Sequence, residues 1–183
     1  LCVLLNSCWC FRKKTAADSA WKHATRVSFA QMFTHLKHAL PSLVGVGAKK
    51  VTERRAIARC VVKLPPKVWH ALREETNPKG PVLATATVAG VSGAKKTSEL
   101  VPLCHQIPLE DCLIRFDLQD PVLSVECEAV AHAKTGVEME ALSGCSSAAL
   151  CVYDMCKGID NDILITDLRL VKKTGGKSDI VRD

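Results

Sequence analysis

The sequence predicts an α+β domain in which helices pack on one face of a mainly antiparallel sheet. Three observations carry this prediction: a strand-like alternation at each end of the domain, two alternating runs joined by a short turn, and helical periodicity between strands. One compact domain is the default for 183 residues, and 48% of them are hydrophobic, which is enough to form a core.

The first half of the domain reads as a strand followed by two helices. Apolar and polar residues alternate over residues 56–64, the pattern of a half-buried strand. Pro66 can begin a short helix, and residues 77–80 (Asn-Pro-Lys-Gly) form a turn. Residues 82–100 are rich in Ala, Val and Gly, which predicts a closely packed helix with Lys95 near its C-terminal end.

The second half reads as hairpin, helix and strand. Residues 112–118 and 123–131 alternate, and Gln-Asp-Pro joins them, which indicates a β-hairpin. Residues 135–138 have the S/T-x-x-E spacing of a capping box, and the helix that follows is expected to end near Lys157. Its buried face comprises Leu142, Cys145, Ala149, Val152 and Cys156. A last strand is expected over about residues 163–171, followed by a polar tail.

Residues 1–32 are expected to lie outside the folded unit, which leaves residues 33–183 as the domain. The apolar run over residues 1–11 is too short to span a bilayer, and basic residues follow it instead of preceding it. This order favours a targeting remnant or a linker from a longer precursor, and no membrane association is expected.

Charge and cysteine usage narrow the class of protein. The net charge of +6 points to an anionic partner, either a phosphorylated small molecule or nucleic acid, although a solvated lysine surface explains it equally well. No CxxC pair occurs, which argues against a zinc ribbon or a thioredoxin-like site. The placement of the cysteines instead indicates free thiols in a reducing compartment, with the cytoplasm expected and the mitochondrion as alternative. Six of them occupy apolar positions as small hydrophobes: Cys60, Cys112, Cys127, Cys145, Cys151 and Cys156.

Two familiar kinds of site are excluded. Residues 175–178 (Gly-Gly-Lys-Ser) look like the end of a P-loop, but Val171 stands where the first glycine is required. Aromatic residues make up only 4% of the chain, so stacking platforms for nucleic-acid bases are missing and no nucleic-acid partner is expected.

Polar residues gather near the ends of the predicted elements. A loop lysine is usually just solvated, and a lone histidine is more often structural than catalytic. Asp154 stands out, because a carboxylate in the last turn of a helix faces the negative end of the dipole while Lys157 lies on the same face. Such opposed influences can tune a carboxylate for proton transfer, whereas the structural alternative is a plain i,i+3 ion pair.

Five runs of sequence resemble the cyclic pyranopterin monophosphate synthase family, called MoaC in bacteria. They are VTERRA (51–56), TSELVPLCH (97–105), TGVEMEAL (135–142), VYDMCK (152–157) and KTGGKS (173–178). The resemblance implies a ferredoxin-like α+β fold and a hexamer of dimers with active sites at subunit interfaces. It implies a lyase of molybdenum-cofactor biosynthesis that converts 3′,8-cyclo-7,8-dihydroguanosine triphosphate to cyclic pyranopterin monophosphate and releases diphosphate.

The resemblance also implies the site. Catalysis would fall to Asp154, Lys157 and Lys79. Substrate would be bound by Leu103, Cys104, His105, Glu138, Met139, Glu140, Arg54, Lys95 and Lys173. No resident cofactor or metal is expected, although Mg²⁺ could accompany the triphosphate.

Two departures from the family pattern leave an alternative open. Gly45 and Pro81 each stand where the family usually has an aspartate. The alternative is a weakly active or inactive homologue that serves as a structural partner subunit. Such a scaffold would be free to lose Lys79, Asp154 or Lys157, and the sequence retains all three.

Overall fold

The computed structural model describes residues 36–37 and 40–182. Contacts divide the chain into two compact units, residues 1–44 and 45–183. In the first unit, β1 (Leu36–Lys37) pairs with β2 (Leu40–Pro41) in an antiparallel ladder. The predicted extension over residues 1–32 lies outside the described residues, so the boundary after residue 32 stays a prediction.

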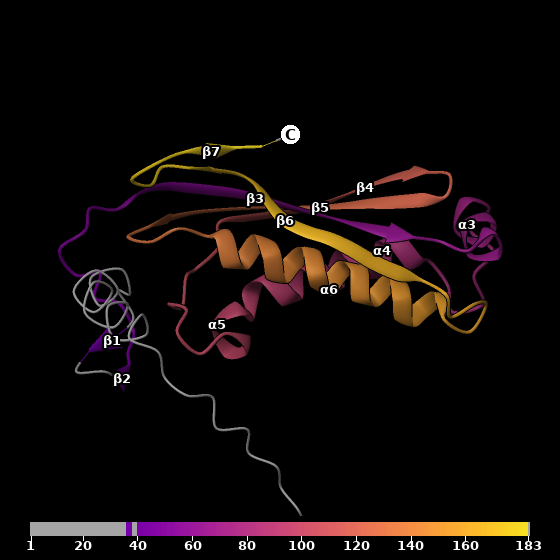
Figure 1. The fold of residues 1–183 in the computed structure, drawn as a ribbon, viewed down its shortest axis with the longest axis horizontal. Coiled ribbons are helices and arrows are strands. Elements are labelled where there is room, and N and C mark those ends of the chain that lie inside the picture. The colour runs from indigo at the N-terminus through magenta and orange to yellow at the C-terminus, as the bar shows by residue number, and fades with distance from the viewer. Residues whose placement is uncertain (1–35, 38–39, 183) are drawn as a thin grey trace, which may run out of the picture. The chain divides into compact units, whose positions relative to one another are not determined.

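The second unit is built on a five-stranded antiparallel sheet with the order β4-β5-β3-β6-β7 (Figure 1). Its strands are β3 (Thr52–Lys63), β4 (Asp111–Gln119), β5 (Val122–Ala133), β6 (Leu164–Thr174) and β7 (Ile180–Val181). Helices link β3 to β4 and β5 to β6, while β4 and β5 form the predicted hairpin. This βαββαβ order of the four long strands confirms the ferredoxin-like α+β fold.

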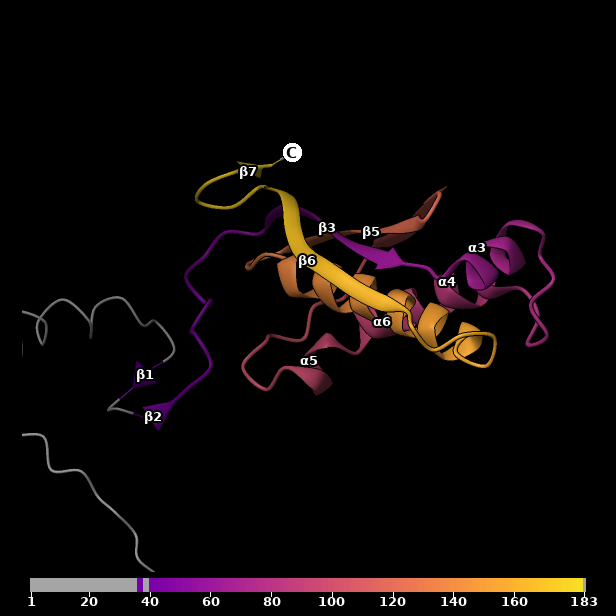
Figure 2. The ribbon, with the colours of Figure 1, turned by 45° about the vertical axis from the view of Figure 1, so that its right-hand side comes forward.

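The helices of this unit are α3 (Pro66–Arg73), α4 (Val82–Lys95), α5 (Thr97–Leu100) and α6 (Glu138–Cys156). The segment predicted as one helix over residues 82–100 is therefore divided at Lys96 into α4 and α5. The two long helices, α4 and α6, lie side by side under one face of the sheet (Figures 1 and 2). They run antiparallel, because Ala94 at the end of α4 lies near Gly144 while Lys79, just before α4, contacts Asp154.

The core lies between the sheet and these helices. On β3 the inward-facing residues Ala56, Ala58, Cys60 and Val62 are at most 1% exposed. The neighbouring strand β5 contributes the inward-facing residues Leu123, Val125, Cys127, Ala129 and Ala131. Of the six cysteines expected at apolar positions, Cys60, Cys127, Cys145 and Cys156 are buried, and Cys112 and Cys151 are half-buried. All six are free thiols, as expected.

Two expectations about element ends are wrong. The capping box does not form: α6 begins at Glu138, and Val137 at its N-cap position makes no side-chain cap hydrogen bond. Glu138 instead accepts a hydrogen bond from Lys173 Nζ (3.1 Å). A four-residue sequence pattern cannot predict a partner that lies 35 residues away in the chain. The polar tail after β6 also turns back, since β7 pairs with β6 opposite Lys172 and Lys173.

Candidate active site

The three predicted catalytic side chains meet at the C-terminal end of α6. Lys79 Nζ donates to the Asp154 carbonyl oxygen (2.7 Å) and lies 3.2 Å from Asp154 Oδ2. Lys157 Nζ lies 2.7 Å from Asp154 Oδ1. We call Lys79, Asp154 and Lys157 the Lys-Asp-Lys cluster. The turn before α4 thus brings together residues that are 75 positions apart in the chain.

The two lysines set the charge state of Asp154. The sequence suggested that the helix dipole and Lys157 shift the pKa of this carboxylate in opposite directions. In the structure the contacts with the two lysines determine the direction of the shift. Hydrogen bonds from Lys157 and then Lys79 lower the pKa of Asp154, with a small opposing effect of burial. The same contact raises the pKa of Lys157. Asp154 is therefore a carboxylate at neutral pH, and its side chain is 60% exposed.

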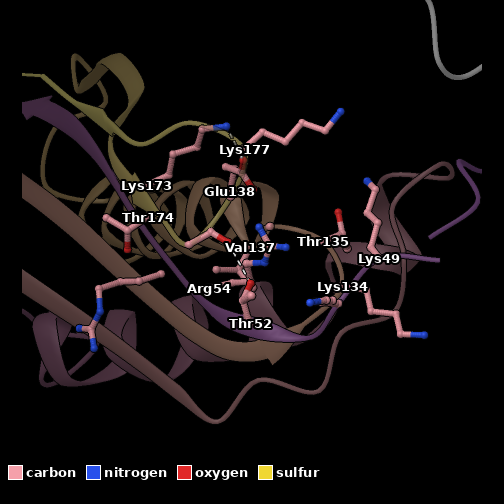
Figure 3. A pocket seen from close by; sticks show the side chains of 15 residues that line it. Lys49, Thr52, Arg54, Lys134, Thr135, Val137, Glu138, Lys173, Thr174 and Lys177 are labelled. Carbon is pink, nitrogen blue, oxygen red and sulfur yellow. Dashed lines mark hydrogen bonds and ion pairs between the residues drawn. The ribbon is translucent and has the colours of Figure 1, made fainter. Parts of the chain in front are cut away.

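A second group of predicted residues lines a pocket at the other end of α6 (Figure 3). This basic pocket has a volume of about 450 Å³. Its basic lining residues are Lys49, Lys50, Arg54, Arg55, Lys134, Lys173 and Lys177. Glu138 is the single acidic residue among the lining residues that the structure describes. A concave surface with seven cationic side chains and one carboxylate favours a polyanionic ligand.

The basic pocket forms where the ends of strands β3, β5 and β6 lie close together. The start of β3 lies opposite the end of β5, and the end of β6 lies opposite Arg55. Arg54 Nε donates to the Ala133 carbonyl oxygen (3.3 Å), and Lys173 pairs with Glu138. Lys49, Lys50 and Lys134 also line the pocket, although no sequence pattern predicted them as site residues. Lys134 directly precedes the TGVEMEAL run, but a lysine by itself gave no reason to select it.

Glu140 is the most perturbed carboxyl group of the site. It lies in the first turn of α6 with 3% of its surface exposed. Burial, with a contribution from the charge of Glu138, raises the pKa of Glu140 to about 7. Burial and the nearby Glu140 charge raise the pKa of Cys104. The loop that carries Cys104 therefore lies close to the N-terminal end of α6, as the predicted substrate site requires.

The remaining predicted residues lie around this end of α6, although Lys95 lines neither pocket in the part of the chain that the structure describes. His105 lines a smaller pocket of about 270 Å³, which shares Lys134 and Thr135 with the basic pocket. Met139 is 38% exposed, and Leu103 is half-buried beside Cys104. Lys95 is absent from the described lining residues of both pockets, and its charge acts on the thiol of Cys112 on β4.

The predicted site therefore falls into two parts within one chain. The Lys-Asp-Lys cluster lies at the C-terminal end of α6, and the basic pocket includes Glu138 at its N-terminal end. A helix rises about 1.5 Å per residue, so Glu138 and Asp154 lie about 24 Å apart along its axis. One chain does not bring all of the predicted site residues together.

The two departures from the family pattern leave the Lys-Asp-Lys cluster in place. Pro81 takes the N-cap position of α4 with φ −72°, and its carbonyl oxygen accepts a hydrogen bond from Thr85 Oγ1 (2.8 Å). Lys79 still reaches Asp154 from the turn before it. Gly45 has open space where a side chain would begin.

In the described part of the chain, no helix is long and apolar enough to cross a membrane. Residues 36–37 and 40–182 contain no group of three or more His, Cys, Asp or Glu side chains placed to hold a metal ion.

Fold and site together define a ferredoxin-like α+β domain with a basic pocket and an exposed carboxylate held between two lysines. Residues 43–176 match the MoaC family, and the chain belongs to this family.

Curated relatives agree with that assignment. The chain is 43% identical over 147 residues to a cyclic pyranopterin monophosphate synthase of Peptoclostridium acidaminophilum, covering 80% of this chain and 94% of the relative. It is 49% identical over 138 residues to the Bordetella avium protein of the same name, covering 74% and 85%. A molybdenum cofactor biosynthesis bifunctional protein of Synechocystis sp. is 43% identical over 159 residues. That match covers 81% of this chain but only 45% of the Synechocystis protein.

Proposed function

We propose that this domain acts in molybdenum-cofactor biosynthesis as a lyase that makes cyclic pyranopterin monophosphate. Its substrate would be 3′,8-cyclo-7,8-dihydroguanosine triphosphate, and diphosphate would leave. Family membership and the names of the relatives support the reaction. The observation that carries the proposal is the Lys-Asp-Lys cluster, in which two lysines keep an exposed carboxylate ionised.

Each part of the site has a role in this reaction. Rearrangement to the pterin requires proton transfers at ring carbons, for which Asp154 is the base and the ammonium groups of Lys79 and Lys157 stabilise the negative charge that develops. The basic pocket binds the triphosphate, since lysines act as point charges for phosphate oxygens. Its cations also neutralise the charge of the departing diphosphate.

A complete site would be shared between subunits. The two parts of the site lie about 24 Å apart on α6, too far for one nucleotide-sized substrate to contact both within a chain. A symmetric oligomer can place the basic pocket of one subunit beside the Lys-Asp-Lys cluster of its neighbour. We propose a homo-oligomer with interface sites, for which the resemblance suggests a hexamer of dimers. Size-exclusion chromatography with light scattering would detect it, and a monomer would contradict it.

The reaction is tested by turnover of the cyclised guanosine triphosphate with purified protein, followed as diphosphate release and as pterin fluorescence after oxidation. We expect product from the unmodified protein and at least about 100-fold less from Lys79→Ala and Asp154→Asn. Lys67→Ala, which removes an exposed lysine at the start of α3, is the matched control and should keep full activity. Near-normal turnover by Asp154→Asn in an intact oligomer would contradict its assignment as the base.

The proposal assigns no resident cofactor to the domain, and Mg²⁺ enters only as a companion of the triphosphate. Turnover in the presence of EDTA tests this point, because loss of activity that Mg²⁺ restores would show that the ion is required. The cytoplasmic location also stays a prediction, which fractionation of the source cells would test.

A further inference from the structure

We propose that Asn77 is a positioning residue that holds Lys79 against Asp154, an inference that rests on the proposed function. Asn77 is a buried polar side chain, 7% exposed, in the turn between α3 and α4. A buried amide needs hydrogen-bond partners, because an unsatisfied one costs about 1–3 kcal/mol. Its contacts show which parts of the molecule it joins.

One end of the Asn77 amide fixes the turn that carries Lys79. Its Oδ1 accepts a hydrogen bond from the backbone N–H of Lys79 (2.8 Å), the side-chain-to-backbone contact typical of an Asx turn. The backbone carbonyl oxygen of Asn77 accepts a second bond from Gly80 N–H (3.0 Å). Gly80 has φ +93°, which an L side chain rarely adopts, so the turn depends on glycine there. These contacts set the direction in which the Lys79 side chain leaves the backbone.

The other end of the amide reaches the last turn of α6. Asn77 Nδ2 donates to the Met155 carbonyl oxygen (3.3 Å) and lies 3.5 Å from Cys156 Sγ. Helix C-termini leave carbonyl groups without intrahelical partners. Lys79 Nζ donates a hydrogen bond to the Asp154 carbonyl oxygen, and Asn77 Nδ2 donates one to the Met155 carbonyl oxygen. The turn therefore caps the helix with two adjacent hydrogen bonds. Asn77 thus links the backbone of Lys79 directly to the helical turn that carries Asp154.

This geometry separates Asn77 from the residues that would touch the substrate. Lys79 is about half exposed and reaches Asp154 through a long, flexible side chain. Such a side chain loses its orientation readily unless its backbone is fixed. Displacement of a catalytic group by about 1 Å can cost on the order of 100-fold in rate. Asn77 acts through Lys79, and its removal should disturb Lys79 more than Lys157, which reaches Asp154 from its own helix.

The test measures Lys79 in two independent ways, in Asn77→Ala and Asn77→Ser. Limited acetylation with mass spectrometry reports how freely the Lys79 amine reacts, relative to the exposed Lys67. We expect Asn77→Ala to raise Lys79 acetylation severalfold and leave Lys157 unchanged, while kcat falls on the order of 10- to 100-fold. Asn77→Ser should recover part of both effects, because a serine hydroxyl can also accept the bond from Lys79 N–H.

The control is Asn161→Ala, which truncates an exposed asparagine in the loop after α6 and should change neither readout. Thermal unfolding and size-exclusion chromatography establish that each variant is folded, and Asn77→Ser serves if Asn77→Ala is not. Unchanged Lys79 acetylation would overturn the inference, even for a protein that shows no turnover. Raised acetylation with unchanged kcat would overturn the role in the reaction. A wild-type protein without turnover contradicts the proposed function separately.

Discussion

At the scale of single residues, α6 carries two carboxyl groups, one near each end, whose surroundings move their pKa values in opposite directions. Lysines lower the pKa of the exposed Asp154, whereas burial raises the pKa of Glu140 to about 7. In the proposed site shared between subunits, this difference would supply one ionised and one protonated acid near neutral pH. Glu140 is protonated in part at pH 7, so it can donate a hydrogen bond that Asp154 cannot.

Glu140→Gln should therefore stabilise the protein at high pH. The pKa of Glu140 is about 7 in the folded protein against 4.5 for the free side chain, so the folded state binds the proton more tightly. Stability is lost as pH rises from about 4.5 to about 7, and above that the full penalty of about 3 kcal/mol remains. Glutamine has no charge to bury and avoids this penalty.

Urea unfolding at pH 5 and pH 8 measures the effect. The gain from Glu140→Gln should be small at pH 5 and about 3 kcal/mol at pH 8. Glu99→Gln, which alters an exposed carboxylate on α5, should give less than about 0.5 kcal/mol at either pH. A gain that does not change with pH would mean that Glu140 is not buried in its charged form.

At the scale of elements, the close approach of α4 and α6 depends on glycines at their crossing. A Cβ at Gly144 would lie 2.6 Å from Cys127 Sγ and 3.2 Å from the Gly90 carbonyl oxygen. Gly144 and Ala148 are buried inside the subunit, while Ser143 and Ser147 are half-buried. Gly144 and Ala148 thus pack α6 against its neighbours within the same subunit.

Gly144→Leu should destabilise the domain by about 3 kcal/mol, because overpacking of a filled core costs more than the helix propensity of leucine returns. Ser92→Leu places the same side chain at an exposed position of α4 and should change the free energy of unfolding by less than about 0.5 kcal/mol. Chemical denaturation of both variants measures the difference. Equal effects would mean that the helices can separate to admit the larger side chain.

At the scale of the whole molecule, the separation of the two parts of the site predicts complementation between inactive variants. Lys79→Ala damages the cluster at one end of α6, and Lys173→Ala damages the basic pocket at the other. If each site draws its two parts from different subunits, mixed oligomers contain sites with both lysines intact. With equal mixing and random assembly, about a quarter of the sites qualify.

Co-expression of the two variants, or joint refolding, should therefore restore up to about 25% of wild-type turnover. Each variant refolded alone is the control and should stay inactive. Mixed oligomers that remain as inactive as the separate variants would place the complete site within one subunit and refute the shared arrangement.

The sequence by itself determined the local elements and, through its matching runs, the family. The hairpin of β4 and β5 was predictable because alternation with period two and a proline turn are encoded within about 20 residues. The turn that carries Lys79 and the C-terminal end of α6 could likewise be predicted from a few consecutive residues. Asp154 and Lys157 could be paired from their spacing alone, since residues three apart share a helix face.

The tertiary structure decided everything that depended on residues distant in the chain. Glu138 pairs with Lys173 instead of forming a capping box, and β7 exists because β6 offers a free edge. The basic pocket could not be predicted, because Lys49 and Lys134 are indistinguishable in sequence from ordinary solvated lysines. Only the fold brings the start of β3 together with the ends of β5 and β6. Periodicity reports which face of an element is apolar, whereas the site depends on which ends the sheet brings together, and only packing determines that.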